Sequence, residues 1–335
     1  MASHTHGNIW DAITMNLLLL YMYDPKYDFD NWLHMKFAEY LAKTDGVNLV
    51  CYGPGLHEKY AHLIRDHYEN TRTFNDLLQT YKSDAVILMT KAKMFRNYRP
   101  ESLYGPGEHD CWLPADFAKV DIPVVVLEED YHYETDDKWY QEMGVDVILQ
   151  RHKCSSLRQT NVPMRWFPFS VDHTTFKCDG RVRHNKVSFV GSYRHAAYPV
   201  RKTAIKKLEG TDYFCMRGRR RVVGADYVNE LRAYISHLCC TSKYSITPAK
   251  IFEIMASGSV LFINDDPQLR ELFEGDCYVT YDNACSEVVA KARWLTEHMP
   301  ESYRKTLVVN ATKQILEKHT HDVRIQELLA IIRGI

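Results

Sequence analysis

Short apolar runs alternate with amphipathic stretches along most of this chain of 335 residues, and this alternation limits its fold more than any other feature. In the first half, runs typical of buried strands occupy residues 15–22, 47–52, 84–90, 122–128 and 145–149, and residues 164–172 form a last extended segment. Stretches typical of helices lie between them at residues 31–43, 73–81 and 136–143. Strands that alternate with helices build a mainly parallel sheet with helices on both faces. We therefore predict a doubly wound, Rossmann-like α/β domain over residues 1–173.

A second unit of the same kind follows the polar segment 174–185, which contains Gly180, has no periodicity and is typical of an interdomain linker. The strands predicted beyond it are residues 186–190, 212–216, 237–240, 260–263 and 277–281, and the helices are residues 200–208, 227–236 and 249–256. Two helical stretches, 284–298 and 303–335, end the chain. We predict a second domain over residues 186–300 and C-terminal helices, residues 301–335, that pack back on the first domain. Ligands of such a pair bind at the carboxyl ends of the strands, in the cleft between the domains.

Charge and composition exclude several classes of protein. Lys and Arg total 42 against 43 Asp and Glu, so no global field attracts nucleic acid or an acidic membrane. The apolar runs are far shorter than a membrane span, and the N-terminus lacks the pattern of a secretory signal. We expect a soluble, cytoplasmic protein. The nine Cys form no CxxC pair and the 16 His are scattered, so no metal site is predicted.

The most specific string of the chain is PAKIFEIMASG at residues 248–258, directly before a predicted strand. Pro248 favours a first helical turn, where free backbone N–H groups attract anions. Lys250 adds positive charge for a diphosphate, and Glu253, three residues later on the same side, can accept hydrogen bonds from a ribose diol. The alternative is that Lys250 and Glu253 form only a solvated pair on a helix surface.

A second string, VSFVGSYR at residues 187–194, is a predicted strand that ends in Gly191 and Ser192. A strand that opens into a helix through such a turn gives a phosphate room beside the backbone. Arg194 is then a candidate clamp for the pyrophosphate, whereas Arg201, one helical turn inside, is equally well explained as a surface charge.

Further candidates follow other strands. The string VVVLEEDYH at residues 124–132 places Asp130 and His132 just after a buried strand, where a catalytic acid or base belongs. Tyr52 and Gly53, after the second strand, are candidates for an acceptor wall. The arginine run that begins with Arg217 and Arg219 follows a later strand and can contact phosphates, with a solvated loop or a nucleic-acid grip as alternatives.

These strings resemble the donor-domain motifs of the retaining group 1 glycosyltransferases of the GT-B fold, in the branch near the CgeB-like spore-maturation proteins. The segment WFPFSVD at residues 166–172 also resembles the passage by which this family leaves its first domain. Two departures stand out. Ser245 occupies the place of the first acid of the family's E-x7-E pair, and no D-x-D metal motif accompanies the nucleotide site.

The resemblance implies an α/β protein of the GT-B fold, a glycosyltransferase with an N-terminal acceptor domain and a C-terminal nucleotide-sugar domain. It implies transfer of a sugar from a nucleotide-diphosphate sugar to an acceptor hydroxyl of a glycan or other molecule, with no metal and no cofactor besides this co-substrate. Three alternatives stay open: a nucleotide-sugar 2-epimerase on the same fold, a glycosyltransferase that acts on modified DNA bases, and a binding module without catalysis.

Overall fold

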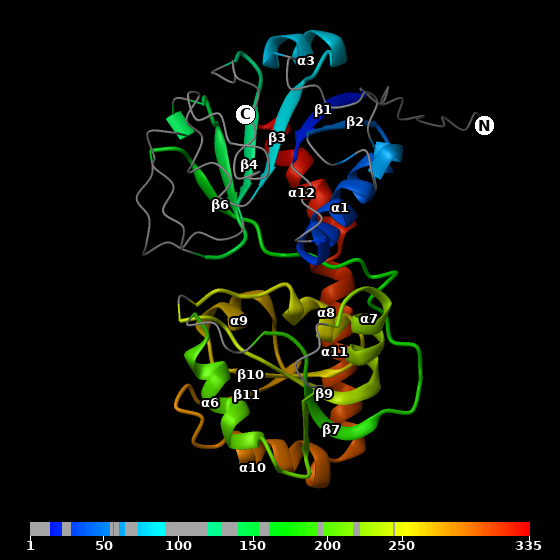
Figure 1. Cartoon of the computed structure of the whole chain (residues 1–335), viewed down its shortest axis with the longest axis vertical. Helices are drawn as coiled ribbons and strands as arrows, with labels where there is room; N and C mark the ends of the chain where they lie inside the picture. Colours follow the sequence, from blue (N-terminus) through cyan, green and yellow to red (C-terminus); the bar gives the residue numbers. More distant parts are fainter. Residues whose placement is uncertain are drawn as a thin grey trace, which may run out of the picture.

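The computed structural model describes the backbone of residues 14–21, 28–53, 56, 60–63, 73–90, 120–128, 140–141, 143–153, 161–192, 197–216, 222–243 and 245–335. Two lobes stand one above the other, each built around one parallel sheet (Figure 1). The two sheets confirm the prediction of two α/β units.

The first sheet has six strands in the order β2-β1-β3-β4-β5-β6. Its strands are β1 Met15–Leu20, β2 Val47–Tyr52, β3 Ala85–Thr90, β4 Val124–Glu128, β5 Val147–Gln150 and β6 Met164–Trp166. All their pairings are parallel. Every residue of β4 is buried, as expected for an inner strand that is covered on both faces.

The second sheet has five parallel strands in the order β11-β10-β9-β7-β8. Its strands are β7 His184–Phe189, β8 Phe214–Met216, β9 Tyr234–Cys239, β10 Val260–Asn264 and β11 Tyr278–Tyr281. The strand order reverses between β7 and β9, so the chain leaves these two neighbours in opposite directions. Doubly wound sheets bind ligands at such a switch point, outside the carboxyl ends of the strands.

Helices pack on both sheets, and those that precede β11 lie between consecutive strands along the chain. They are α1 Asp28–Ala42, the short 3₁₀ turn η2 Ala61–Leu63, α3 Phe74–Tyr81, α6 Pro199–Leu208, α7 Gly224–Ala233, α8 Lys250–Ala256, α9 Pro267–Leu272, α10 Val288–Arg293, the π-turn η3 Trp294–His298, α11 Glu301–Lys318 and α12 His321–Arg333. The local sequence explains where several of these helices begin. Thr73 and Asp76 form a capping box at α3, and Asp266 caps α9, whose first residue is Pro267.

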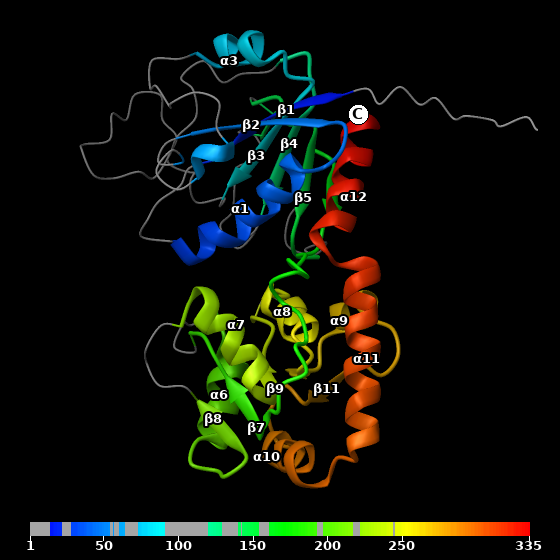
Figure 2. The same cartoon turned by 90° about the vertical axis from the view of Figure 1, so that its right-hand side faces the viewer.

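The last two helices serve different lobes (Figure 2). Ala311 and Ile315 of α11 pack in the core of the second sheet, together with α8. Ile325 and Leu328 of α12 pack in the core of the first sheet. Of the predicted C-terminal stretch, the part that packs on the first lobe is therefore α12. The helical stretch predicted over residues 303–335 is divided at Thr320, which starts α12 by accepting a hydrogen bond from the Val323 N–H at 3.3 Å.

The chain crosses between the lobes twice, and the two crossings pair with each other. The N–H of Val171 donates to the carbonyl of His319 at 3.0 Å, and the N–H of His321 donates to the carbonyl of Val171 at 3.2 Å. Residues beyond this pair already belong to the second lobe, because Arg232 of α7 donates to the carbonyls of Thr175 and Lys177. The crossing thus lies before the predicted linker at 174–185.

The remaining predictions of helices and strands differ from the structure mainly at their ends. The helix predicted at 227–236 ends at Ala233, because residues 234–236 already pair as the start of β9. Helix α9 was not predicted, since its six residues are too few to show a period. Most of the helix predicted at 136–143 lies outside the described residues.

Candidate functional site

The two strings of the second domain meet at the switch point of its sheet. Lys250, the first residue of α8, donates a hydrogen bond from its ammonium to the carbonyl of Val190, which directly follows β7. The next residue, Gly191, has a φ of +132°, and a Cβ there would lie 2.4 Å from the Lys250 Nζ. Because Gly191 has no side chain, the backbone can adopt this conformation and the lysine has room to lie against the end of β7.

The surroundings of Lys250 modulate its charge. Burial, together with the nearby positive charge of Arg201, lowers the pKa of Lys250 to about 8, whereas Glu253 acts in the opposite direction. The ammonium also lies 5.6 Å from the ring centre of Phe189 and 5.7 Å from that of Tyr227. Near neutral pH the lysine is thus mostly charged, and it sits between aromatic rings at the strand ends.

Glu253 is buried under the same helix, with 2% of its surface exposed. Its Oε2 accepts a hydrogen bond from the hydroxyl of Tyr227 at 2.5 Å. Its Oε1 has no hydrogen-bond partner among the described residues. Burial raises the pKa of Glu253, and the bond from Tyr227 and the charge of Lys250 offset part of that effect. The solvated pair that the sequence left as an alternative is therefore wrong for Glu253, which is buried.

Arg201 of α6 holds the loop that follows β7. Its guanidinium donates to the carbonyl of Ser192 at 2.8 Å and to that of Cys240 at 3.2 Å, and it lies 3.7 Å from the ring centre of Tyr198. With 7% exposure it is not the surface charge that the sequence allowed. The backbone carbonyl of Ser192 is thereby fixed, while its side chain stays exposed at the strand end.

The loop between β9 and α8 is held from several sides. Asn264 accepts a hydrogen bond from the Thr241 N–H at 2.9 Å and donates to the Thr241 hydroxyl at the same distance. Ser245 has a φ of +54°, and its carbonyl accepts a hydrogen bond from the Gln268 amide at 2.7 Å. The Gln268 Oε1 also accepts from the Lys153 N–H of the first domain at 3.3 Å. This loop, which carries a serine where the family has its first acid, is thus tied to the opposite domain.

The candidate acceptor wall has a different environment. Tyr52, the last residue of β2, is 2% exposed and packs in the core under α3. It cannot stack on a sugar from this position, so the prediction for its side chain is corrected. Gly53 follows it and is also buried.

Five further predicted site residues lie outside the described residues. They are Asp130, His132, Arg194, Arg217 and Arg219. Their roles stay predictions.

Tyr227 was not among the site residues predicted from the sequence. Tyr227 lies 26 positions before Glu253 on another helix, and only the packing of α7 against α8 joins the two. No local pattern marks a pair of this kind. Arg201 gave a weak signal, because its spacing from Tyr198 places the two side chains on one face of a helical turn.

The described residues contain no cluster of three or more His, Cys, Asp or Glu side chains able to hold a metal ion. Within the same residues, no helix is both long and apolar enough to span a bilayer. The seven described cysteines are free, at positions 51, 178, 215, 239, 240, 277 and 285.

Solved structures share this architecture over nearly the whole chain. A glycosyltransferase from Rickettsia africae superposes with a TM-score of 0.63 at 10% identity, covering 96% of this chain and 98% of the other. The Anabaena protein HepE, solved in complex with UDP-glucose, superposes with a TM-score of 0.61 at 11% identity, covering 96% of this chain and all of the other. Two doubly wound domains that face a common crevice define the GT-B fold, and this chain has that fold.

The family of the second domain follows from its sequence. Residues 181–330 match a family model described as glycosyl transferase-like. A search of curated proteins found no match. The chain has the GT-B fold, and its second domain matches a glycosyl transferase-like family model, as the resemblance seen in the sequence implies. Its placement in the CgeB-like branch stays a prediction.

Proposed function

We propose that this protein transfers a sugar from a nucleotide-diphosphate sugar to an acceptor hydroxyl, with the donor held at the carboxyl ends of β7 and β9. The observation that carries the proposal is the contact of Lys250 with the end of β7. It joins two strings that lie 60 positions apart in one crevice, at the switch point where such sheets bind nucleotides.

Lys250 would balance charge on the departing diphosphate. An ammonium has three N–H donors, so Lys250 can keep its bond to the Val190 carbonyl and still offer donors to phosphate oxygens. In the reaction the acceptor oxygen bonds to the anomeric carbon, the bond from that carbon to the diphosphate oxygen breaks, and the acceptor proton passes to a base. Cationic groups placed at a leaving group are often the largest single contribution to catalysis.

Glu253 would bind the ribose of the donor. Its Oε2 already accepts from Tyr227, and its Oε1 lacks a partner in the described structure. A ribose hydroxyl that reached Oε1 would supply the missing hydrogen bond. Asp130 and His132 are the proposed groups that orient the acceptor hydroxyl or take its proton.

The nature of the donor is supported by HepE, a protein of the same fold that was solved with UDP-glucose. The comparison gives the class of donor for that protein, and we extend the class, without the base or the sugar, to this chain. No metal or further cofactor enters the proposed reaction.

Analysis of the products formed from the donor alone tests the proposed reaction. The protein is incubated with each of several nucleotide-diphosphate sugars, with and without a mixture of sugar acceptors, and the released nucleoside diphosphate is measured. We expect release that acceptors accelerate, with kcat lowered roughly 100-fold or more in Lys250→Ala and unchanged in Lys202→Ala, an exposed lysine of α6. Conversion of the donor to an isomer with its diphosphate intact would identify an epimerase and overturn the proposal.

A further inference from the structure

The first turn of α9 joins the first domain to the loop between β9 and α8. Its second residue, Gln268, is 7% exposed and uses both ends of its carboxamide. The Nε2 donates to the carbonyl of Ser245 in that loop at 2.7 Å, and the Oε1 accepts from the N–H of Lys153 in the first domain at 3.3 Å. Because one partner is an acceptor and the other a donor, the carboxamide satisfies both in only one of its two orientations. Gln268 therefore links a backbone group of each domain.

Helix α9 is fixed at both of its ends. At its start, the Gln268 N–H donates to the carboxylate of Asp266 at 3.0 Å. At its end, the carbonyl of Leu272 accepts a hydrogen bond from the Nε2 of His319 at 3.2 Å. His319 belongs to the crossing between the domains, where its carbonyl pairs with the N–H of Val171. Helix α9 thus extends from the crossing to the loop between β9 and α8.

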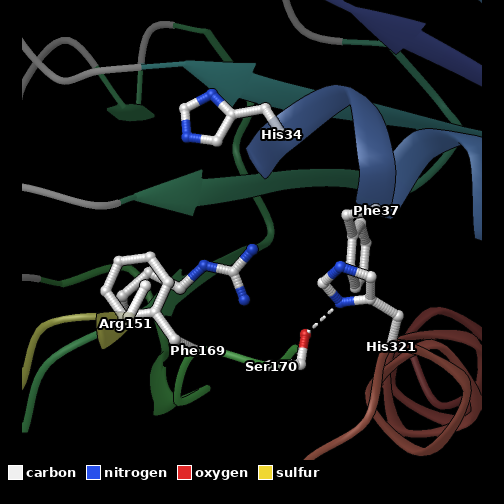
Figure 3. Close-up of a pocket in the computed structure, with 7 residues that line it drawn as sticks. His34, Phe37, Arg151, Phe169, Ser170 and His321 are labelled. Carbon is white, nitrogen blue, oxygen red and sulfur yellow. Dashed lines mark hydrogen bonds between the residues drawn. The ribbon is translucent and has the colours of Figure 1, made fainter. Parts of the chain in front are cut away.

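The crossing is in turn held by the first domain. The guanidinium of Arg151, which directly follows β5, donates to the carbonyl of Pro168 at 3.4 Å. Its carbon lies 5.5, 5.1 and 5.4 Å from the ring centres of three phenylalanines, Phe37, Phe167 and Phe169. Ser170 and the Nδ1 of His321 form a hydrogen bond of 2.8 Å between the two crossing segments (Figure 3). These contacts fix the end of α9 that lies at the crossing relative to the first domain.

A second contact between the domains lies three residues further along α9, on the same side of the helix as Gln268. The ammonium of Lys153 forms an ion pair with the carboxylate of Glu271 and lies 5.4 Å from the ring centre of Trp166 of β6. The charged side chains are 39% and 45% exposed, so the pair adds little to stability. It keeps the backbone of Lys153 beside the carboxamide of Gln268.

The loop end of this link is a strained turn. Ser245 has a φ of +54°, a conformation that residues with a Cβ seldom adopt. Its N–H donates to the carbonyl of Ser242 within the loop at 3.0 Å, and Gln268 holds its carbonyl from outside the loop. Lys250 begins α8 five residues later. The bond from Gln268 therefore supports the strained part of the segment that leads to the lysine.

We propose that Gln268 is a positioning residue of the sugar transfer, through which contact between the two domains sets the conformation of the loop between β9 and α8. The proposal rests on the proposed function. When the domains separate, the N–H of Lys153 leaves Gln268, and the carboxamide can turn away from Ser245. When the domains meet, the carboxamide is fixed again and holds the strained turn. Lys250 can bind a diphosphate in both states, whereas the loop beside it acquires its conformation for transfer only in the closed state.

Hydrogen exchange of the loop tests this link without any substrate. The full-length protein is studied at low ionic strength, and exchange is measured for the amides of residues 241–249. Lys153→Glu sets two carboxylates against each other across the domain contact, so we expect these amides to exchange about 3- to 10-fold faster. Lys153→Glu with Glu271→Lys restores an ion pair of opposite direction and should restore slow exchange. Both substitutions are on exposed side chains, so the test does not depend on a core variant.

A double-mutant cycle shows whether the effect passes through Gln268. Gln268→Met keeps the volume of the side chain and removes both hydrogen bonds, so the loop should exchange faster. Adding Lys153→Glu to Gln268→Met should then change loop exchange no further, because the link is already cut. Gln314→Met is the matched control, since the Gln314 carboxamide, 9% exposed on α11, bridges the N–H and the carbonyl of Glu274 at 2.7 Å each. Unchanged exchange in Lys153→Glu, or additive effects in the cycle, would overturn the proposal.

Turnover separates a positioning role from a merely structural one. With a donor identified by product analysis, Gln268→Met should lower kcat about tenfold and leave the calorimetric affinity for the nucleoside diphosphate unchanged, whereas Gln314→Met should change neither. An equal loss of nucleoside diphosphate affinity in Gln268→Met, or an unchanged kcat, would overturn the positioning role. If no nucleotide sugar is turned over by the wild-type protein, the proposed function fails, and hydrogen exchange still reports whether Gln268 links the domain contact to the loop.

Discussion

A methyl group at residue 191 would stand 2.4 Å from the ammonium of Lys250, so the conformation of Gly191 and the position of that lysine depend on each other. The lysine reaches the end of β7 because no side chain blocks it, and its bond to the Val190 carbonyl then holds the turn. The two residues belong to different strings of the sequence and to one site in the structure.

Replacing Gly191 should therefore affect ligand binding as well as stability. In Gly191→Ala the new methyl group displaces the lysine, and we expect nucleotide affinity to fall at least about tenfold and unfolding free energy to fall by about 1 to 3 kcal/mol. Gly210→Ala is the matched control, because Gly210 also has a positive φ, +84°, with nothing within 4 Å of its would-be Cβ. Gly210→Ala should lower the stability of the protein but leave its nucleotide affinity unchanged. Equal nucleotide affinity in both variants, measured by calorimetry, would show that Gly191 does not position the lysine.

Nucleotide affinity should depend on pH through Lys250. Its pKa is lowered to about 8, so the ammonium is charged below that pH and becomes neutral above it. We expect affinity for a nucleoside diphosphate to decrease as the pH rises from 7 to 9. In Lys250→Arg the side chain stays charged over this range, and this decrease should disappear. A decrease of the same size in both proteins would assign the effect to another group.

The hydroxyl of Tyr227 should stabilise the buried carboxylate of Glu253. Tyr227→Phe removes the donor to Oε2, and we expect the free energy of unfolding at pH 8 to fall by about 1 to 3 kcal/mol. Because burial raises the pKa of Glu253, its protonated form favours the folded state, and this contribution is lost as the pH rises through the folded-state pKa. The loss in Tyr227→Phe should therefore be smaller at pH 5.

Urea denaturation at both pH values measures these effects. Adding Glu253→Gln to Tyr227→Phe removes the charge that lacks a donor. The double variant should therefore recover most of the unfolding free energy that Tyr227→Phe loses at pH 8. A loss in Tyr227→Phe that is independent of pH and of Glu253→Gln would contradict the pairing.

Acid should destabilise the protein through buried neutral histidines. Burial lowers the pKa of His237 and His321 to about 3 and that of His319 to about 4. In the unfolded chain these rings take up protons near pH 6.5, so the unfolded state binds more protons between that pH and the folded pKa values. Stability should fall as the pH drops through this window, by about 1.4 kcal/mol per pH unit for each histidine.

Denaturation between pH 7.5 and 5 measures this dependence. His319→Gln should make the dependence shallower, whereas His298→Gln, on an exposed ring, should leave it unchanged. An unchanged slope in His319→Gln would show that this ring does not drive the loss.

The sequence predicted both sheets and the donor strings because these features are local. Continuous apolar runs mark β4 and β10, and Pro248, Gly191 and Gly258 mark turns that few other residues allow. Interactions between distant segments carry no such mark. The bond of Tyr227 to Glu253, the pairing of Val171 with His319, and the place of Arg151 among three phenylalanine rings all depend on packing between elements far apart in the chain.

Tyr52 shows that the residue at which a strand ends is easier to predict than the side of the sheet to which its side chain points. It ends β2 as predicted, but the alternation of side chains along the strand points its ring into the core. A run of buried residues in a parallel strand has no polar face from which this direction can be read.

The measurement that tests the central claim most directly is a thermal-shift panel of UDP, GDP, ADP, CDP and TDP with their sugars, on three proteins. Wild type and Lys202→Ala should be stabilised by one nucleotide, because a ligand that binds only the folded state raises the melting temperature. Lys250→Ala should need at least about tenfold more of it for the same shift. No shift with any nucleotide, or the same shift in Lys250→Ala, would contradict a donor site at the end of β7.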